Sequence, residues 1–471
     1  MNYHRILKDF SIAVISQGIS MLLSVVTSLL VPKVLGVAEF GYWQLFIFYI
    51  SYVGFFHLGL NDGVYLLKGG QTRDEIDKVS IGRQFWCGMA YQTIFAAIIG
   101  LIAILGPFEE KREFVIIVTA LFMLLNNASS FIGYVFQSMN ETKLFSFSVI
   151  VERLIFFVPL AFLLVARVSS FEPYVVAYAA SKTCALAYCV CNARALLSPD
   201  FSNVVAAFQE TRGSIRVGIK LMLANTASML ILGIARALID SVWGIETFGQ
   251  LSLSLSMVGF FSTFATQASM VLFPSLRRSA GHEQQSFFRS ARNALGLFLP
   301  AVYLFCVPAI WAMTLWLPQY SQAMTFFIIL LPMCVFECKM DITCTTYFKV
   351  LREEKLLLRI NAATVIASAT FSCLGAYLFN SVFLVIAGAV VSFILRSTYS
   401  EYLLSKQLGV STTSITPEEI LLTIMFVVTA YTLPGYASVA IYASAYILFL
   451  YINRDTLLCT IGQLRRMGAS K

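Results

Sequence analysis

The chain has 471 residues, of which 58% are hydrophobic and 12% are charged, and its mean hydropathy is +0.79. Ordinary soluble domains carry roughly 25% charged residues, so this composition excludes a soluble globular protein. The formal net charge of +8 is scattered over short loops without a basic stripe, which argues against nucleic acid as a partner.

Apolar segments follow one another along almost the whole chain. A helix of roughly 20 apolar residues crosses the hydrocarbon core of a bilayer. We expect the first segment to be a membrane helix, because it is longer than the apolar part of a signal peptide. With about 14 such segments, the predicted fold class is an all-α integral membrane protein. The predicted transmembrane helices lie at approximately 10–31, 42–60, 84–105, 114–138, 145–166, 174–192, 217–239, 249–273, 294–317, 322–345, 357–379, 381–403, 418–433 and 437–452.

Lysine and arginine are concentrated in alternate loops. When the N-terminus is placed in the cytoplasm, most loop lysines and arginines fall on the inner side of the membrane. Cytoplasmic loops carry such an excess, so we expect a multi-pass protein with both termini in the cytoplasm. The outer loops are short. A membrane enzyme such as a polysaccharide polymerase would need a substantial outer loop, which disfavours that class.

Two short patterns recur at similar offsets in the two halves of the chain. The pattern Gly-x-x-x-Phe-Gly occurs at 36–41 and again at 244–249. A second set of four residues follows a helix in each half, and its members are Phe136, Glu141, Lys143 and Leu144, then Phe348, Glu353, Lys355 and Leu356. Together the two repeats predict an internal duplication.

The duplication predicts two pseudo-symmetric six-helix halves plus two C-terminal helices. The N-terminal lobe comprises 1–194 and the C-terminal lobe 217–406, with a cytoplasmic linker at 195–216. Two extra helices and a cytoplasmic tail occupy 407–471. Transporters built from parallel repeats bind substrate between the halves and alternate access to that site.

Six basic residues lie inside predicted membrane helices. A charge at the bilayer centre costs roughly 2.5–3.5 kcal/mol on insertion scales, so such residues usually face the bundle interior or a watery cavity. An excess of buried cations suggests an anionic ligand such as a phosphate or carboxylate. The candidate cavity cations are Arg153, Lys182, Arg236, Lys339, Arg359 and Arg396.

Structural roles compete with ligand binding at three of these positions. Arg359 and Arg396 could place their charged ends at the membrane surface while their stems remain in the apolar layer. Lys339 could form an ion pair with Glu337 or Asp341 on its own helix.

The other three cations differ in depth. Arg236 and Asp240 are one helical turn apart and could pair. Arg153 and Lys182 lie deeper, where snorkelling explains them less well. Glu152 is adjacent to Arg153 and therefore points to a different face of the helix. A cavity-lining role is favoured for Arg153 and, less strongly, for Lys182.

Amide side chains in or next to the predicted helices are candidates for contacts with sugar hydroxyls. They are Asn61, Asn126, Asn225 and Gln267. Hydrogen bonding between helices is the competing interpretation for each amide.

The sequence contains no arrangement of residues typical of an enzyme. It has three histidines, no phosphate-binding glycine-rich loop, and ten cysteines without the spacing of a zinc site. We therefore expect no catalysis, no metal and no cofactor. Energy would come from the membrane potential or from proton or sodium coupling, with Asp62, Glu152 and Asp341 as candidate coupling residues.

Several of these motifs resemble those of bacterial polysaccharide flippases. The segment at 35–41 resembles the LG-x-x-x-(F/Y)G element that follows their first helix, and 244–249 resembles the matching element of the second half. The segment 59–63 is similar to their GL-N turn, and 136–143 to their Q-x-x-N-x-x-K turn. These motifs are shared across the multidrug/oligosaccharidyl-lipid/polysaccharide exporter superfamily.

One position departs from the family pattern. Many relatives have Asp-Arg near the outer end of the seventh helix, whereas this chain has Ala235 followed by Arg236. The cation is kept and its usual acidic neighbour is absent, which places in doubt any coupling role for that acid.

The resemblance implies an O-antigen-type flippase in the bacterial cytoplasmic (inner) membrane. Its cargo would be an undecaprenyl-diphosphate-linked oligosaccharide, moved from the inner to the outer leaflet for O-antigen or capsule synthesis. The polyprenyl tail would stay in membrane lipid, and a polysaccharide polymerase and chain-length proteins are candidate partners. The alternative is a cation-coupled drug or metabolite antiporter of the same fold.

Overall fold

The computed structural model describes residues 18, 22–198, 203–278, 281–410 and 415–469. Every regular element in these ranges is helical. The chain divides into two compact units, Met1–Thr226 and Ala227–Lys471, and each is described by itself.

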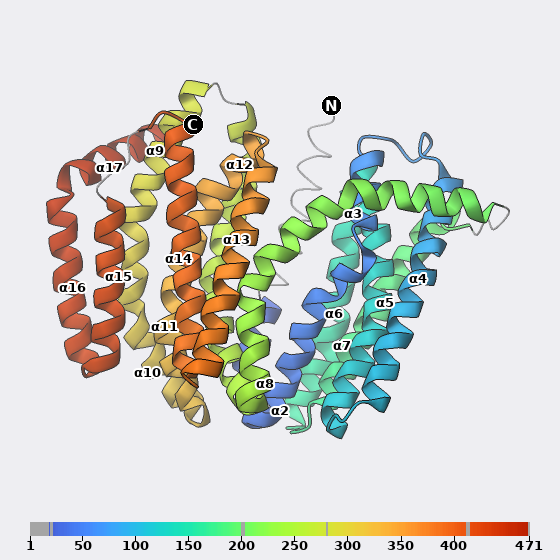
Figure 1. The fold of residues 1–471 in the computed structure, drawn as a ribbon, viewed down its shortest axis with the longest axis horizontal. Coiled ribbons are helices and arrows are strands. Elements are labelled where there is room, and N and C mark those ends of the chain that lie inside the picture. Colours follow the sequence, from blue (N-terminus) through green and yellow to red (C-terminus); the bar gives the residue numbers. More distant parts are fainter. Residues whose placement is uncertain (1–17, 19–21, 199–202, 279–280, 411–414, 470–471) are drawn as a thin grey trace. The chain divides into compact units, whose positions relative to one another are not determined.

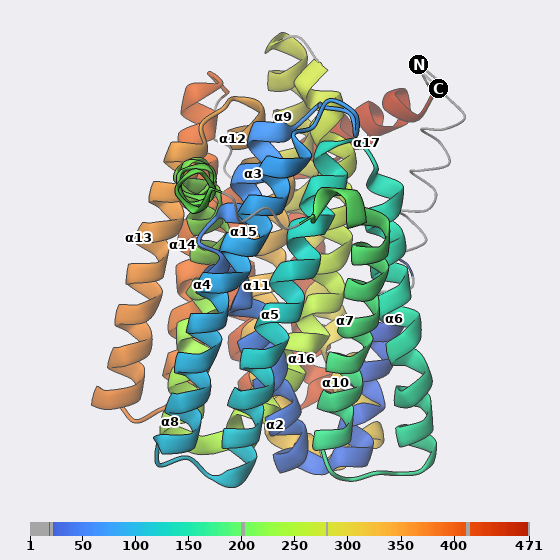
Figure 2. The ribbon, with the colours of Figure 1, turned by 90° about the vertical axis from the view of Figure 1, so that its right-hand side faces the viewer.

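The first unit is a bundle in which α5 packs against α3, α4 and α7 (Figures 1 and 2). Its core includes Phe85, Phe131 and Phe136. The elements are α2 (Val31–Tyr52), η1 (Val53–His57), α3 (Leu60–Lys68), α4 (Lys78–Leu105), α5 (Glu110–Ser138), α6 (Thr142–Val165), α7 (Glu172–Ala193), η2 (Arg194–Leu196) and the first part of α8 (Val204–Arg278).

The second unit is built around α11, which packs against α14 and α15. Its elements after α8 are α9 (Gly281–Phe298), η3 (Leu299–Phe305), α10 (Cys306–Trp316), η4 (Pro318–Tyr320), α11 (Ser321–Lys339), η5 (Met340–Thr345), α12 (Thr346–Val350), α13 (Glu354–Cys373), η6 (Leu374–Leu378), α14 (Val382–Gln407), α15 (Ile415–Thr432), α16 (Gly435–Ile452) and α17 (Arg454–Ala469). The turns η5 and η6 are π-helical.

Among the described residues, 11 helices are long and apolar enough to span a membrane. One of these spans, Val204–Phe260, covers the predicted helix at 217–239 and the start of the one at 249–273. The predicted helix at 418–433 corresponds to α15. Half of the predicted segment 10–31 lies outside the described residues, and 22–29 are helical. The predicted all-α membrane class is confirmed.

The linker predicted at 195–216 is largely helix, because α8 already begins at Val204. In Figure 1 the first part of α8 runs across α3 and α4 rather than alongside them. The Ser214 hydroxyl donates to Gln84 Oε1 at 2.6 Å. A Cβ on Gly63 would lie 1.9 Å from the Ser214 carbonyl oxygen. Most of the predicted linker therefore belongs to a helix that packs within the first unit.

The two Gly-x-x-x-Phe-Gly segments adopt the same backbone geometry. Gly36 has φ 76° and ψ 177°, and Gly244 has φ 81° and ψ −177°. This region is open essentially to glycine alone. Phe40 and Phe248 are both fully buried. Each motif breaks a long helix at its first glycine and anchors the break with its phenylalanine.

The second repeat is a matched pair of helix C-terminal turns. Asn140 and Arg352 both have φ 58°. The Glu141 N–H donates to the Phe136 carbonyl at 2.8 Å, and the Glu353 N–H donates to the Phe348 carbonyl at 2.8 Å. This is the Schellman arrangement, in which the residue after a left-handed one donates to the carbonyl five residues before it. Both repeated patterns therefore have the same local geometry in the two halves of the chain, as an internal duplication predicts.

The packing of α8 on α3 predicts a sharp difference between two glycines of α8. A Cβ on Gly218 would lie 2.0 Å from the Gly59 carbonyl oxygen, whereas nothing lies within 4 Å of one on Gly213. Overpacking of this kind costs about 1–3 kcal/mol or more, so Gly218→Ala should lower the melting temperature measured by tryptophan fluorescence in detergent. Gly213→Ala should leave it unchanged or raise it. Equal melting temperatures for the two variants would contradict the close contact.

Candidate functional site

The deepest predicted cations of the first unit lie on neighbouring helices. Arg153 is on α6, and its Nη1 donates to the hydroxyl of Tyr178 on α7 at 3.4 Å. Among the described side chains, no carboxylate lies within ion-pair distance of the Arg153 guanidinium. Its Nε is buried without a hydrogen-bond partner. Arg153 therefore has no ion-pair partner among the described side chains and keeps an unused donor.

Lys182 and Glu152 form a buried ion pair. Lys182 Nζ lies 2.9 Å from Glu152 Oε2, and the two side chains are 11% and 10% exposed. The charge of Lys182 is balanced, and Glu152, a predicted coupling residue, serves as its partner. Glu152 therefore faces Lys182 rather than Arg153, its neighbour in the chain.

Tyr178 is held by an aromatic cluster that the sequence did not indicate. Its ring contacts Trp43, Phe46, Phe122 and Phe156, with centroid separations of 6.0, 6.0, 5.7 and 5.0 Å. Such edge and stacked contacts fix ring orientation. The cluster thereby fixes the position of the hydroxyl that Arg153 meets.

Asp62 lies on α3 beside a histidine. His57 Nδ1 accepts a hydrogen bond from the Gly59 N–H at 3.0 Å, so in the neutral ring Nε2 carries the proton. Nε2 lies 3.8 Å from Asp62 Oδ2, and both side chains are buried. The buried pair could hold a proton or a cation, and the coupling role of Asp62 stays a prediction.

The predicted amides have different surroundings. Asn61 donates to the Asn127 carbonyl at 3.4 Å, and Asn126 donates to Asn127 Oδ1 at 3.5 Å. These bonds within the first unit match the interhelical interpretation for Asn61. Asn225 is exposed on α8, and the side chain of Gln267 lies outside the described part.

In the second unit, Lys339 does not pair with Glu337 or Asp341. Its Nζ lies 2.8 Å from Glu401 Oε2 on α14 and 2.6 Å from Glu419 Oε2 on α15. Residues two apart on a helix point in very different directions, so Lys339 is directed to other helices. The pairing expected from the sequence is wrong, and Lys339 is balanced by two buried carboxylates.

The ionic cluster around Lys339 extends to a fourth helix. Arg292 on α9 places its Nε 3.6 Å from Glu401 Oε1, and its side chain is 2% exposed. Arg292 falls in the predicted loop between the helices at 249–273 and 294–317, and Glu419 was not among the predicted site residues. The available signal for Glu419 was the presence of a carboxylate in the first turn of the apolar segment 418–433.

The remaining cations of the second unit have distinct partners. Arg236 donates from Nη2 to the Ser252 hydroxyl at 2.9 Å and lies over the Phe248 ring at 5.0 Å. Arg396 is buried within the second unit, where its Nη1 lies 3.3 Å from Glu337 Oε2 and its side chain is 3% exposed. Arg359 is exposed on α13.

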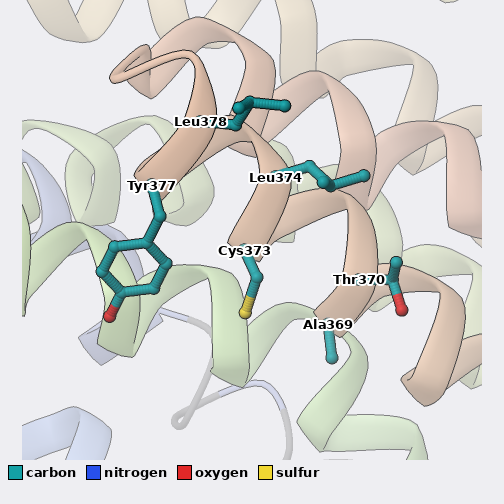
Figure 3. A pocket seen from close by; sticks show the side chains of 6 residues that line it. All are labelled: Ala369, Thr370, Cys373, Leu374, Tyr377 and Leu378. Carbon is teal, nitrogen blue, oxygen red and sulfur yellow. The ribbon is translucent and has the colours of Figure 1, made fainter.

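Two hollows lie along α13. One, of about 540 Å³, lies between α13 and α14 and brings Arg359 and Arg396 together. The other, of about 580 Å³, is lined by successive turns near the C-terminal end of α13 and by η6, with the Thr370 hydroxyl and the Cys373 thiol among apolar side chains (Figure 3). Asp341 lies in the π-helical turn η5, half-buried.

The pair between Lys182 and Glu152 predicts a compensation effect on stability. Lys182→Met alone leaves Glu152 buried and unpaired, which should lower the free energy of unfolding by about 3–5 kcal/mol. Adding Glu152→Gln should recover most of this loss, because no buried charge then remains. Thermal unfolding in detergent measures both variants. An unchanged melting temperature for Lys182→Met alone would show that the pair contributes nothing to stability.

The chain resembles known proteins in sequence family and in fold. Residues 6–280 match the family described as polysaccharide biosynthesis protein, and no curated protein matches the chain in sequence. An inward closed conformation of the lipid II flippase MurJ is similar at a TM-score of 0.67 and 10% identity, over 95% of this chain and 99% of that one. An inward-facing multidrug resistance MATE family transporter of the MOP superfamily is similar at 0.58 and 11% identity, over 83% and 94%. The chain is a multi-pass membrane protein that belongs to the polysaccharide biosynthesis protein family and has the fold of this transporter superfamily.

Proposed function

We propose that this protein flips an undecaprenyl-diphosphate-linked oligosaccharide from the cytoplasmic to the outer leaflet of the bacterial inner membrane. The cargo would serve O-antigen or capsule synthesis, and the protein would act by alternating access rather than by catalysis. The family match and the fold shared with a lipid II flippase support transport of a lipid-linked substrate in general.

The observation that carries the proposal is the state of Arg153. A diphosphate that leaves water needs donors to replace its hydration shell, and a guanidinium supplies them in a planar fork. Arg153 is half-buried, has no carboxylate partner among the described side chains and meets a tyrosine hydroxyl at 3.4 Å. The charge is available to an anion in a way that the paired Lys182 is not.

We assign the other predicted residues secondary roles in this scheme. Arg236 would be a candidate cation of the second unit, and Asn225 and Gln267 would contact sugar hydroxyls. Lys339 and Arg396 are balanced by carboxylates, so they would shape the second unit rather than meet the cargo directly.

The energy source and topology complete the proposal. With both termini in the cytoplasm, an inside-negative potential drives an anionic headgroup outward, with about 2.3 kcal/mol per charge per 100 mV. Proton or sodium coupling would instead use Asp62, whose carboxylate lies near His57, or Asp341. Dissipating the potential while holding the ion gradients fixed separates the two sources.

Deleting the protein in its native host tests the function itself. We expect a diphosphate-linked oligosaccharide to accumulate in the inner leaflet, measured by lipid analysis with sidedness probed in spheroplasts. Complementation with the unaltered chain should restore the distribution. Normal lipid-linked sugars together with raised drug sensitivity would favour the antiporter.

Substitution of Arg153 tests the proposed site. Loss of a hydrogen bond to a charged group costs about 1.5–3 kcal/mol, so Arg153→Ala should slow translocation by about ten- to a hundredfold without loss of folded protein. Arg153→Lys should retain part of the rate, because it keeps the charge but not the fork. Arg194→Ala is the matched control, since Arg194 is exposed. Normal surface polysaccharide in the combined Arg153→Ala, Lys182→Ala variant would disprove the cationic site.

A further inference from the structure

The hollow between α13 and α14 combines cations with an apolar surround. Its lining includes Arg359, Arg396, Ser392, Thr364, Leu395 and Tyr399. The Thr364 and Ser392 hydroxyls donate to carbonyls of their own helices, at 2.8 and 2.9 Å. The donors left to meet a ligand are the two guanidiniums and the Tyr399 hydroxyl.

Arg396 contributes a buried donor without an acceptor. Its side chain is 3% exposed, and its Nη1 is engaged by Glu337. Its Nε is buried and has no hydrogen-bond partner. A buried unsatisfied donor on a charged group is costly, and an anion in the cavity would satisfy it.

Arg359 contributes an exposed charge at the same cavity. No described carboxylate lies within ion-pair distance of it. Lys355 precedes it by one turn on α13 and is also exposed. Glu337 and nearby Asp341 both offset the charge of Arg396, so the remaining positive charge of the cavity wall is that of Arg359. This balance suits a phosphodiester, with one negative charge, better than a diphosphate.

The surface beside the cavity is apolar. Val391, Leu395, Tyr399 and Tyr402 of α14 are 44%, 54%, 55% and 51% exposed. Their spacing of three and four residues places them on one face of the helix. Such a stripe suits acyl chains, and aromatic residues with a polar tip are typical of the membrane interface.

We propose that this cavity binds the phosphodiester headgroup of an anionic membrane phospholipid, with its acyl chains on the α14 stripe. Arg359 and the Arg396 Nε donate to the phosphate oxygens, and Tyr399 caps the site. The cavity volume of about 540 Å³ is within the range of small-molecule sites. The site lies in the second unit and does not depend on the cargo proposed above.

Binding of phosphatidylglycerol to the purified full chain in neutral detergent tests the proposal. We expect phosphatidylglycerol to bind and to raise the melting temperature, and phosphatidylcholine to do neither at the same concentration. Arg359→Gln should raise the dissociation constant about fivefold, the factor expected for one basic residue near an anionic lipid. Arg359 is exposed, so this variant should fold.

Lys406→Gln is the matched control, because Lys406 is exposed on α14 and does not line the cavity. It should bind phosphatidylglycerol as the unaltered protein does. Equal binding by Arg359→Gln, or an equal loss in Lys406→Gln, would overturn the site. Two competition results would also overturn it. Inorganic phosphate that binds as tightly as phosphatidylglycerol would indicate a free-phosphate site, and tighter binding of farnesyl diphosphate than of phosphatidylglycerol would indicate a diphosphate site.

Discussion

The balance of charge inside the apolar helices determines where most of their charged side chains lie. A charge without a partner is expensive away from water, and a paired one is costly to separate. Lys182 meets Glu152, Arg396 meets Glu337, and Lys339 lies between two glutamates. Each pair joins different helices, so charge balance also fixes how the helices pack.

The ionic cluster connects the C-terminal helices with the rest of the second unit. The sequence suggests that 407–471 is an appendage to two six-helix halves. In the structure, Glu419 of α15 is fully buried and meets Lys339 of α11, and Arg292 of α9 joins through Glu401. The first of the two extra helices is therefore tied electrostatically into the core of the second unit.

Local patterns were predictable from the sequence, and contacts between helices were not. Gly36 and Gly244 repeat one backbone conformation because a short motif encodes it. The partners of Lys339 could not be found in this way, since two nearby acids suggested a pairing within one helix whereas the real partners are 62 and 80 residues away. The helical start of α8 was missed because its charged residues resemble a loop, while close glycine contacts hold it against α3.

Some buried cations are paired with carboxylates and others are not. This difference determines which cations can bind a transported anion. Removing a carboxylate from its buried partner costs about 3–5 kcal/mol, so a cargo that had to displace Glu152 or Glu419 would first meet that barrier. Arg153 gives up only a hydrogen bond of 3.4 Å to a neutral hydroxyl. An anion can therefore bind and leave there with little rearrangement, and a translocation site needs both steps to be easy.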